Sequence, residues 1–184
     1  MFSSVTLRSA ATEDRPALLL RPWREADVPA LRRAHADPVL RRRTAYPVVG
    51  ESDGLMFVED HRRDWELGTR FGFAVLEEET GRLVGCAVLK RPSAAGPAAE
   101  VGYWTAAHAR GLGVAPRALE AVTAWAFETF GGAGLDRLDL LHQEDNEASC
   151  RVAAKSGYAL EAVLPPAPPE FPLSGHLHVR RAPA

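Results

Sequence analysis

The stretch that most constrains this chain runs from a strand through a glycine-rich turn into a helix. Residues 99–105, AEVGYWT, have the pattern of a strand, and residues 109–119, ARGLGVAPRAL, lead into a helical pattern from about 114 to 130. The first backbone amides of a helix lack intrahelical partners, and the helix dipole favours negative charge beside them. The turn therefore predicts an anion site, with phosphate as its natural guest.

Three explanations of the turn compete. A P-loop needs Lys followed by Ser or Thr after its last glycine, but Val114, Ala115 and Pro116 follow Gly113, so a P-loop is excluded. A dinucleotide fingerprint needs a third glycine where Pro116 stands, so that match is weak. The third explanation is purely structural, with glycines that only allow a tight turn. The turn by itself does not separate the structural explanation from an anion site.

The rest of the chain mixes strand and helix patterns without an internal repeat. Phe71, Phe73 and Val75 alternate with smaller residues and begin the clearest hairpin, which turns at Thr80 and Gly81. Before the hairpin we predict a strand ending at Pro22, a helix stopped by Asp37 and Pro38, and a second helix from its N-cap Ser52 to Leu67, which carries Leu55, Val58 and Trp65 on one stripe and ends at Gly68. After the hairpin we predict a loop at 91–98, a strand at 135–142, and a helix from its N-cap Asn146 to Lys155 that ends at Gly157. Two last strands, 158–164 and 175–181, lie on either side of a proline-rich loop. This order predicts one α/β domain covering residues 1–184.

Composition excludes several classes of protein. The chain has 184 residues, 46% of them hydrophobic and 25% charged, and a formal net charge of −2, which fit a soluble domain and argue against a nucleic-acid partner. We expect no membrane span and a cytoplasmic location, because no signal-peptide core and no long apolar window occurs. Cys86 and Cys150 are expected to be reduced packing thiols.

Several short motifs in order resemble one family. Arg110, Gly113 and Ala115 form R-x-x-G-x-A, and residues 146–158, NEASCRVAAKSGY, carry N-x-x-S at Asn146 and Ser149. Together with RPWREAD and EVGYW they resemble the GNAT superfamily of N-acetyltransferases, in the branch that includes ribosomal-protein N-terminal acetyltransferases, over about residues 18–164. The resemblance implies a mixed, mostly antiparallel sheet flanked by helices. It also implies a V-shaped splay between the fourth and fifth predicted strands.

The resemblance implies acetyl-CoA as co-substrate, with pantetheine between residues 101–105 and 138–142. An extended chain with two amides can pair with an open strand edge. The implied cofactor-binding residues are Val101, Gly102, Tyr103 and Trp104 along the strand, Arg110, Gly111, Leu112, Gly113, Val114 and Ala115 around the pyrophosphate, and Asn146 and Ser149. Pro116 departs from the usual Ser or Thr and removes a hydroxyl and an N–H, but a first helical turn tolerates proline. Arg117 is either a phosphate ligand that offsets this loss or a solvated surface residue.

Two catalytic roles follow from the same resemblance. Ser149 is the candidate to protonate or stabilise the departing CoA thiolate, and the alternative is a serine that completes a helix cap. Glu100 is the candidate general base, acting on the amine through water, and the alternative is a structural strand acid. Glu161 and Glu170 are weaker candidates, and His142 is expected to be a solvated strand-end histidine.

Several questions stay open at this level. The acceptor is expected to be a primary amine, either a protein N-terminus or a small molecule, and dimers are implied by resemblance only. The donor is acetyl-CoA or another acyl-CoA such as succinyl-CoA, and a non-catalytic acyl-CoA-binding module is the rival to an enzyme. The basic run at 40–46, LRRRTAY, is either a solvated helix end or a patch for an acidic peptide or the CoA 3′-phosphate. No metal is predicted, because no Cys or carboxylate joins His176 and His178 in the sequence pattern.

Overall fold

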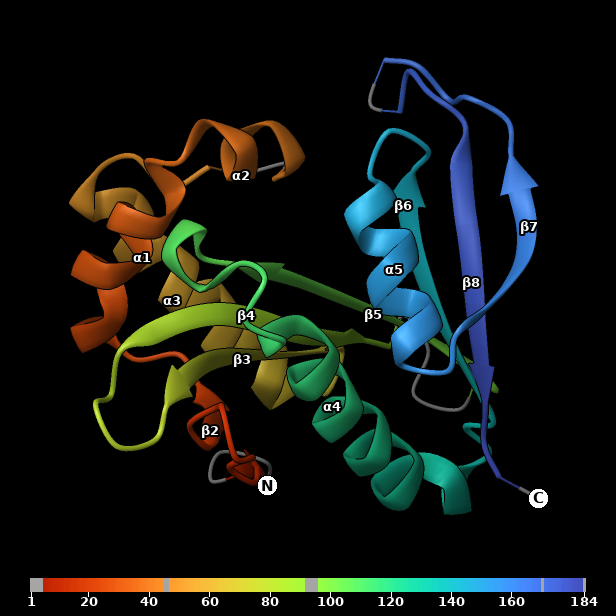
Figure 1. Cartoon of the computed structure of the whole chain (residues 1–184), viewed down its shortest axis with the longest axis horizontal. Coiled ribbons are helices and arrows are strands. Elements are labelled where there is room, and N and C mark those ends of the chain that lie inside the picture. Colours follow the sequence, from red (N-terminus) through yellow and green to blue (C-terminus); the bar gives the residue numbers. More distant parts are fainter. Residues whose placement is uncertain (1–4, 45–46, 92–95, 170, 184) are drawn as a thin grey trace.

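The structure is a computed structural model, and it describes residues 5–44, 47–91, 96–169 and 171–183 (Figure 1). Eight strands form one sheet in the order β1-β2-β3-β4-β5-β6-β8-β7. All neighbours in the sheet are antiparallel except β5 and β6, which are parallel. The strands are β1 Leu7–Ser9, β2 Leu18–Pro22, β3 Arg70–Glu77, β4 Leu83–Lys90, β5 Ala98–Thr105, β6 Arg137–Gln143, β7 Ala159–Leu164 and β8 Gly175–Arg181.

Helices cover both faces of the sheet. The helices are α1 Val28–His35, α2 Pro38–Arg43, α3 Glu51–Leu67, α4 Val114–Phe130 and α5 Glu147–Lys155, with 3-10 turns at Glu25–Asp27, Ala107–Ala109 and Gly131–Ala133. In Figure 1, α4 and α5 lie in front of the sheet, and α1 and α3 lie behind it. The prediction of a mixed, mostly antiparallel sheet flanked by helices is therefore confirmed.

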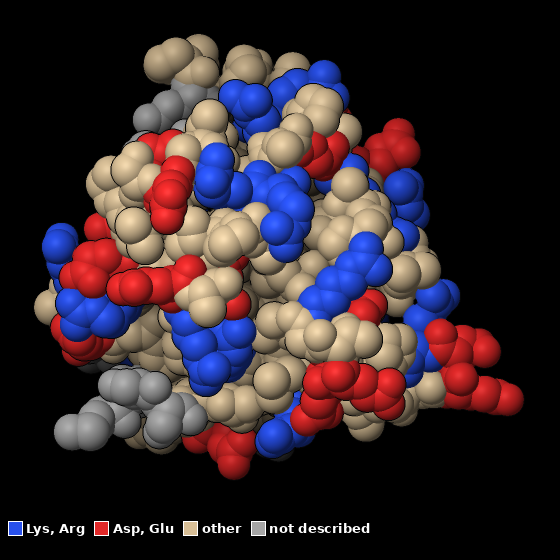
Figure 2. Space-filling model, turned by 90° about the vertical axis from the view of Figure 1, so that its left-hand side faces the viewer, with Lys and Arg blue, Asp and Glu red and all other residues tan. Residues whose placement is uncertain are grey.

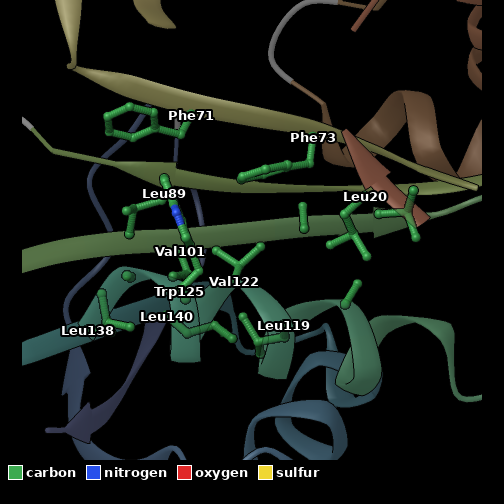
Figure 3. Close-up of a cluster of buried hydrophobic side chains, with 14 of the residues drawn as sticks. Leu20, Phe71, Phe73, Leu89, Val101, Leu119, Val122, Trp125, Leu138 and Leu140 are labelled. Atoms are coloured by element: carbon green, nitrogen blue, oxygen red, sulfur yellow. The ribbon is translucent and has the colours of Figure 1, made fainter. Parts of the chain in front are cut away.

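Strand alternation divides the hydrophobic residues between two cores. Phe71, Phe73 and Val75 of β3 belong to the larger core, where they pack with Val122 and Trp125 of α4 (Figure 3). The residues between them on β3 face the other way, and Ala74 and Leu76 belong to the smaller core with α1 and α3. Full burial of a large apolar side chain stabilises a fold by about 1.5–3 kcal/mol, so these two cores fix which helix covers which face.

The hairpin, the helix at 114–130 and the stop at Gly68 agree with the sequence predictions. Four details differ. The short strand β1 was not predicted. The strands predicted as the fourth and fifth are therefore β5 and β6, and the splay lies between them. α3 begins at Glu51 with Gly50 as its N-cap instead of Ser52, and Leu55 is 42% exposed instead of buried. α1 ends at His35, before Asp37 and Pro38 as predicted, but Asp37 then caps a further helix, α2, that was not predicted.

The loop predicted at 91–98 is cut by β5, which already begins at Ala98, and residues 92–95 lie outside the described residues.

The parallel pairing of β5 and β6 stops halfway along both strands. It runs from Ala98 opposite Arg137 to Val101 opposite Leu140. Beyond this point β5 continues to Thr105 while pairing only with β4, and β6 continues while pairing only with β8. The facing edges of β5 and β6 therefore separate after Val101, as the predicted splay requires.

Candidate active site

The glycine-rich turn lies at the open end of this splay and leads from β5 into α4. Gly111 and Gly113 have φ of 74° and 72°, in the left-handed region that L side chains rarely adopt. Within the described chain, the amides of Gly111, Gly113, Val114 and Ala115 have no hydrogen-bond acceptor. Four donors at a helix N-terminus form a surface that favours an anion.

The two residues after this turn behave differently from each other. Pro116 is the third residue of α4, where its missing N–H interrupts no helical bond, and α4 forms over its full predicted length. Arg117 turns away and donates to the hydroxyl of Ser9 and to the carbonyls of Ser9, Ala10 and Pro16. It is therefore neither a solvated residue nor a ligand of the turn; it holds the N-terminal segment against α4.

Helix α2 bridges the two strands that separate. Asp37 caps α2 through the amides of Val39 and Leu40, and it also accepts from Arg110 in the turn after β5. At the other end, Arg43 donates to the Asp145 carboxylate over 2.7 Å, in the loop after β6. The basic run is thus neither only a solvated helix end nor a free patch.

The surface around α2 carries both positive and negative side chains. Figure 2 shows Lys and Arg interspersed with Asp and Glu over the side that carries α1 to α3. Arg41 and Arg42 are exposed there, whereas residues 45 and 46 of the same basic run lie outside the described residues.

Ser149 and Tyr103 meet on the α5 side of the splay. Ser149 is buried in the first turn of α5, and its Oγ lies 2.8 Å from the Tyr103 hydroxyl. Tyr103 stands two residues beyond Val101, where β5 has left β6. Burial raises the pKa of Tyr103, so its hydroxyl keeps its proton near neutral pH. The two hydroxyls form a hydrogen-bonded pair, whereas the sequence had predicted only backbone contacts for Tyr103.

Asn146 occupies the N-cap position of α5 without acting as a side-chain cap. No side-chain cap bond forms, and its carbonyl accepts from the Ser149 amide over 2.8 Å. The predicted capping role is therefore wrong. The amide side chain of Asn146 is left for another partner.

Glu100 lies on the opposite face of the sheet. Strand alternation directs Glu100, Gly102 and Trp104 towards α1 and α3, and Trp104 stacks there on Trp23 with ring centroids 6.2 Å apart. Glu100 is one residue before the last parallel pair and forms an ion pair with Lys90. It also lines an open hollow of about 420 Å³, whose other lining residues are Thr69, Arg70, Lys90, Ala98, Ala99, Asp139 and Leu141.

The weaker base candidates are placed elsewhere. Glu161 lies on β7 and forms ion pairs with Arg137 at 3.2 Å and Arg181 at 3.0 Å. Glu170 lies outside the described residues.

A cluster of three histidines and a cysteine lies beneath α5. It consists of His142 on β6, Cys150 on α5, and His176 and His178 on β8, and we call it the His/Cys cluster. His142 is half-buried rather than a solvated strand end, and burial lowers the pKa of His142 and His178. A Cys does join the histidine pair, contrary to the premise of the sequence analysis. No short spacing motif signals the cluster, because its members come from three separate elements.

Comparison with known proteins identifies the family. The model of the acetyltransferase (GNAT) domain matches residues 17–159. The chain belongs to the GNAT family and is an acyltransferase. A search of curated protein sequences gives no significant match.

Solved structures of other GNAT acetyltransferases share this fold. A putative ribosomal-protein-serine acetyltransferase from Vibrio cholerae aligns with a TM-score of 0.82 and 21% identity over 99% of this chain and 100% of that chain. RimJ from Mycobacterium smegmatis, in complex with CoA-disulfide, aligns with a TM-score of 0.78 and 22% identity over 97% of this chain and 86% of that chain. The microcin C7 self-immunity acetyltransferase MccE, in complex with acetyl-CoA and AMP, aligns with a TM-score of 0.77 and 19% identity over 90% of this chain and 92% of that chain.

Within the described residues, no helix combines the length and apolarity needed to cross a membrane.

Proposed function

We propose that this GNAT protein is an N-acetyltransferase that moves the acetyl group of acetyl-CoA to a primary amine by direct attack in a ternary complex. The observation that carries the proposal is the end of β5–β6 pairing at Val101 and Leu140, between the open amides of the turn and the Ser149–Tyr103 pair. MccE and RimJ, which have the same fold, are described with acetyl-CoA and CoA-disulfide respectively.

In this proposal the cofactor follows the opening between β5 and β6. Its pyrophosphate accepts from the amides of Gly111, Gly113, Val114 and Ala115, and the pantetheine amides pair with the unpaired edge of residues 102–105. Asn146 is placed to hydrogen-bond pantetheine, because its side chain makes no cap bond. Pro116 supplies no donor, so the phosphates depend on the other amides of the turn.

The two sides of the sheet divide the chemistry. The Ser149–Tyr103 pair lies on the α5 face, where a hydroxyl proton stabilises the CoA thiolate as the thioester carbon–sulfur bond breaks. Glu100 lies on the other face, where its carboxylate takes a proton from the attacking amine through water. Acid and base then act from opposite sides of the point where β5 and β6 separate, and the amine enters from the hollow beside Glu100.

The acceptor that fits best is a weakly basic amine, such as a protein N-terminus. An α-amino group with a pKa near 7.8 costs only about 1 kcal/mol to deprotonate at pH 7, so one carboxylate acting through water suffices. The structural neighbours include a protein described as a putative ribosomal-protein-serine acetyltransferase, which agrees with this acceptor class. We keep small-molecule amines as the second arm of the test.

The test measures thiol release from acetyl-CoA against peptide N-termini and small amines. Ser149→Ala is expected to lower kcat by about 100-fold with little change in KM for acetyl-CoA, because it removes a proton donor that acts in the transition state. Ser156→Ala, a buried serine at the other end of α5, is the matched control and should retain kcat. Glu100→Gln should lower kcat, because the amide cannot take a proton from the attacking amine.

Three outcomes would contradict the proposal in whole or in part. If acetyl-CoA raises the melting temperature but no amine releases thiol, the chain is an acyl-CoA-binding module. If succinyl-CoA is used in preference to acetyl-CoA, the donor is wrong although the acyl-transfer chemistry stands. Failure of both acetyl-CoA and CoA to change the melting temperature would remove the cofactor assignment itself.

A further inference from the structure

We propose that His142, Cys150, His176 and His178 form a four-coordinate zinc site that fastens α5 to β6 and β8. The cluster lies outside the acyl-transfer chemistry described above, and its argument does not depend on that chemistry. The four ligand atoms all lie within 4.8 Å of one another. They belong to β6, α5 and β8, and His142 and His178 are 36 residues apart in the chain, so the fold brings them together.

Three of the six separations between the ligand atoms are close to those around a tetrahedral ion. His142 Nε2 lies 3.2 Å from His178 Nε2, and Cys150 Sγ lies 3.4 Å from His142 Nε2 and 3.2 Å from His176 Nδ1. With Zn–N of about 2.1 Å and Zn–S of about 2.3 Å, tetrahedral angles place two nitrogens roughly 3.4 Å apart and sulfur and nitrogen roughly 3.6 Å apart. The three distances therefore need only a few tenths of an ångström of expansion around an ion.

A second contact orients one of the ligands. His142 Nδ1 lies 2.8 Å from the backbone carbonyl of Gln143, which can only accept a hydrogen bond. The proton therefore sits on Nδ1, and the lone pair of Nε2 faces Cys150 and His178. Histidines that bind a metal through one ring nitrogen usually donate the N–H of the other ring nitrogen to such a carbonyl, which fixes the orientation of the ring.

The donor set selects the metal. One thiolate and three imidazoles suit a borderline-soft ion such as Zn²⁺, whereas Mg²⁺ and Ca²⁺ require oxygen ligands that the cluster lacks. Four protein ligands fill a tetrahedral sphere, which is typical of structural zinc rather than catalytic zinc with an open position. On binding, the Cys150 thiol loses its proton to solvent and the zinc–sulfur bond forms.

The position of the cluster gives the ion a mechanical role. Cys150 is the residue after Ser149, in the first part of α5, and the histidines belong to the sheet beneath it. A bound ion would hold this end of α5 on β6 and β8, and so would hold Ser149 beside Tyr103. Cys150 is thus a metal ligand rather than the packing thiol that composition suggested.

The experiment titrates the untagged full-length chain, after treatment with a chelator, with Co²⁺ and then with Zn²⁺. We expect one equivalent of Co²⁺ to give a thiolate-to-cobalt charge-transfer band and the intense visible bands of a tetrahedral ion, and Zn²⁺ to displace it. Cys150→Ser should abolish the charge-transfer band, and His178→Gln should weaken Co²⁺ binding by more than about 100-fold, beyond the cost of losing an outer support.

Matched controls remove the same side chains elsewhere. Cys86→Ala and His108→Gln should each keep one equivalent and the unchanged spectrum, since Cys86 is buried in the smaller core and His108 is exposed outside the cluster. Circular dichroism checks that each variant is folded.

The wild-type titration decides the matter even if the ligand variants fail to fold. A folded wild-type chain that binds no equivalent of Co²⁺, or that gives the weak spectrum of an octahedral ion, overturns the proposal. A charge-transfer band that survives in Cys150→Ser also overturns it. The first result would mean that the cluster is a hydrogen-bonded network without metal, and the second would mean that Co²⁺ is not held there by four protein ligands.

Discussion

The glycine-rich turn at 110–115 and the His/Cys cluster beneath α5 present their binding groups in opposite ways. The turn offers backbone amides of consecutive residues, and its two glycines are needed for their φ of 74° and 72°. The cluster offers side chains from β6, α5 and β8. In the turn, residue type matters because it sets the backbone conformation; in the cluster, each residue matters because its side chain is itself the ligand.

This contrast explains why the two regions should respond differently to substitution. A side chain can be removed from the turn without removing a donor, as for the exposed Leu112. No member of the cluster can be replaced without losing a ligand atom. The following experiments test that difference.

The largest expected effect is the stabilisation of the cluster by zinc. At a free Zn²⁺ concentration of 100 times Kd, a site that binds only the folded state adds about 2.7 kcal/mol to the free energy of unfolding. In a chain of this size that corresponds to a rise in melting temperature of roughly 5–10 °C. Differential scanning calorimetry with and without Zn²⁺ measures it, and Cys150→Ser should lose the rise. An equal rise in both proteins would place zinc elsewhere.

The next effect concerns the backbone of the turn. Gly113→Ala has space for its methyl group, because no atom lies within 4 Å of a Cβ built there, but a left-handed alanine costs about 1–2 kcal/mol. We expect the Kd for CoA, measured by calorimetric titration, to rise by about 10-fold as the turn relaxes. Leu112→Ala is the control and should leave Kd within about twofold, since its backbone conformation is unchanged. A larger loss for Leu112→Ala would show that side chains carry the binding.

The smallest effect concerns α2, which joins the turn, through Asp37 and Arg110, to the loop between β6 and α5, through Arg43 and Asp145. The Asp145 side chain is 52% exposed, so Arg43→Gln should lower the free energy of unfolding by less than about 1 kcal/mol. Urea unfolding at low and high salt measures this, with the exposed Arg42→Gln as control. A loss above about 2 kcal/mol that persists at high salt would make α2 a structural brace between the turn and this loop.

The same contrast separates what could be predicted from what could not. The hairpin at Thr80 and Gly81, the turn at Gly113 and the start of α4 follow from local rules, because φ preferences, alternation and unpaired helix amides act within a few residues. Ser149 was also singled out, since its motif is short and contiguous, and its catalytic role stays a prediction. The predicted capping role of Asn146 was wrong, since Asn146 occupies the N-cap position but its side chain makes no cap bond.

What the sequence by itself determined was therefore the order of the elements apart from β1 and α2, the glycine-rich turn before α4, and the family. The tertiary structure alone decided that Glu100 and Ser149 lie on opposite faces of the sheet, that α2 spans the ends of β5 and β6, and that Cys150 meets three histidines. These contacts join residues far apart in the chain, and they form only when hydrophobic burial fixes which helix covers which face. Local backbone preferences carry no information about that choice, because the same helix and strands satisfy them in any packing.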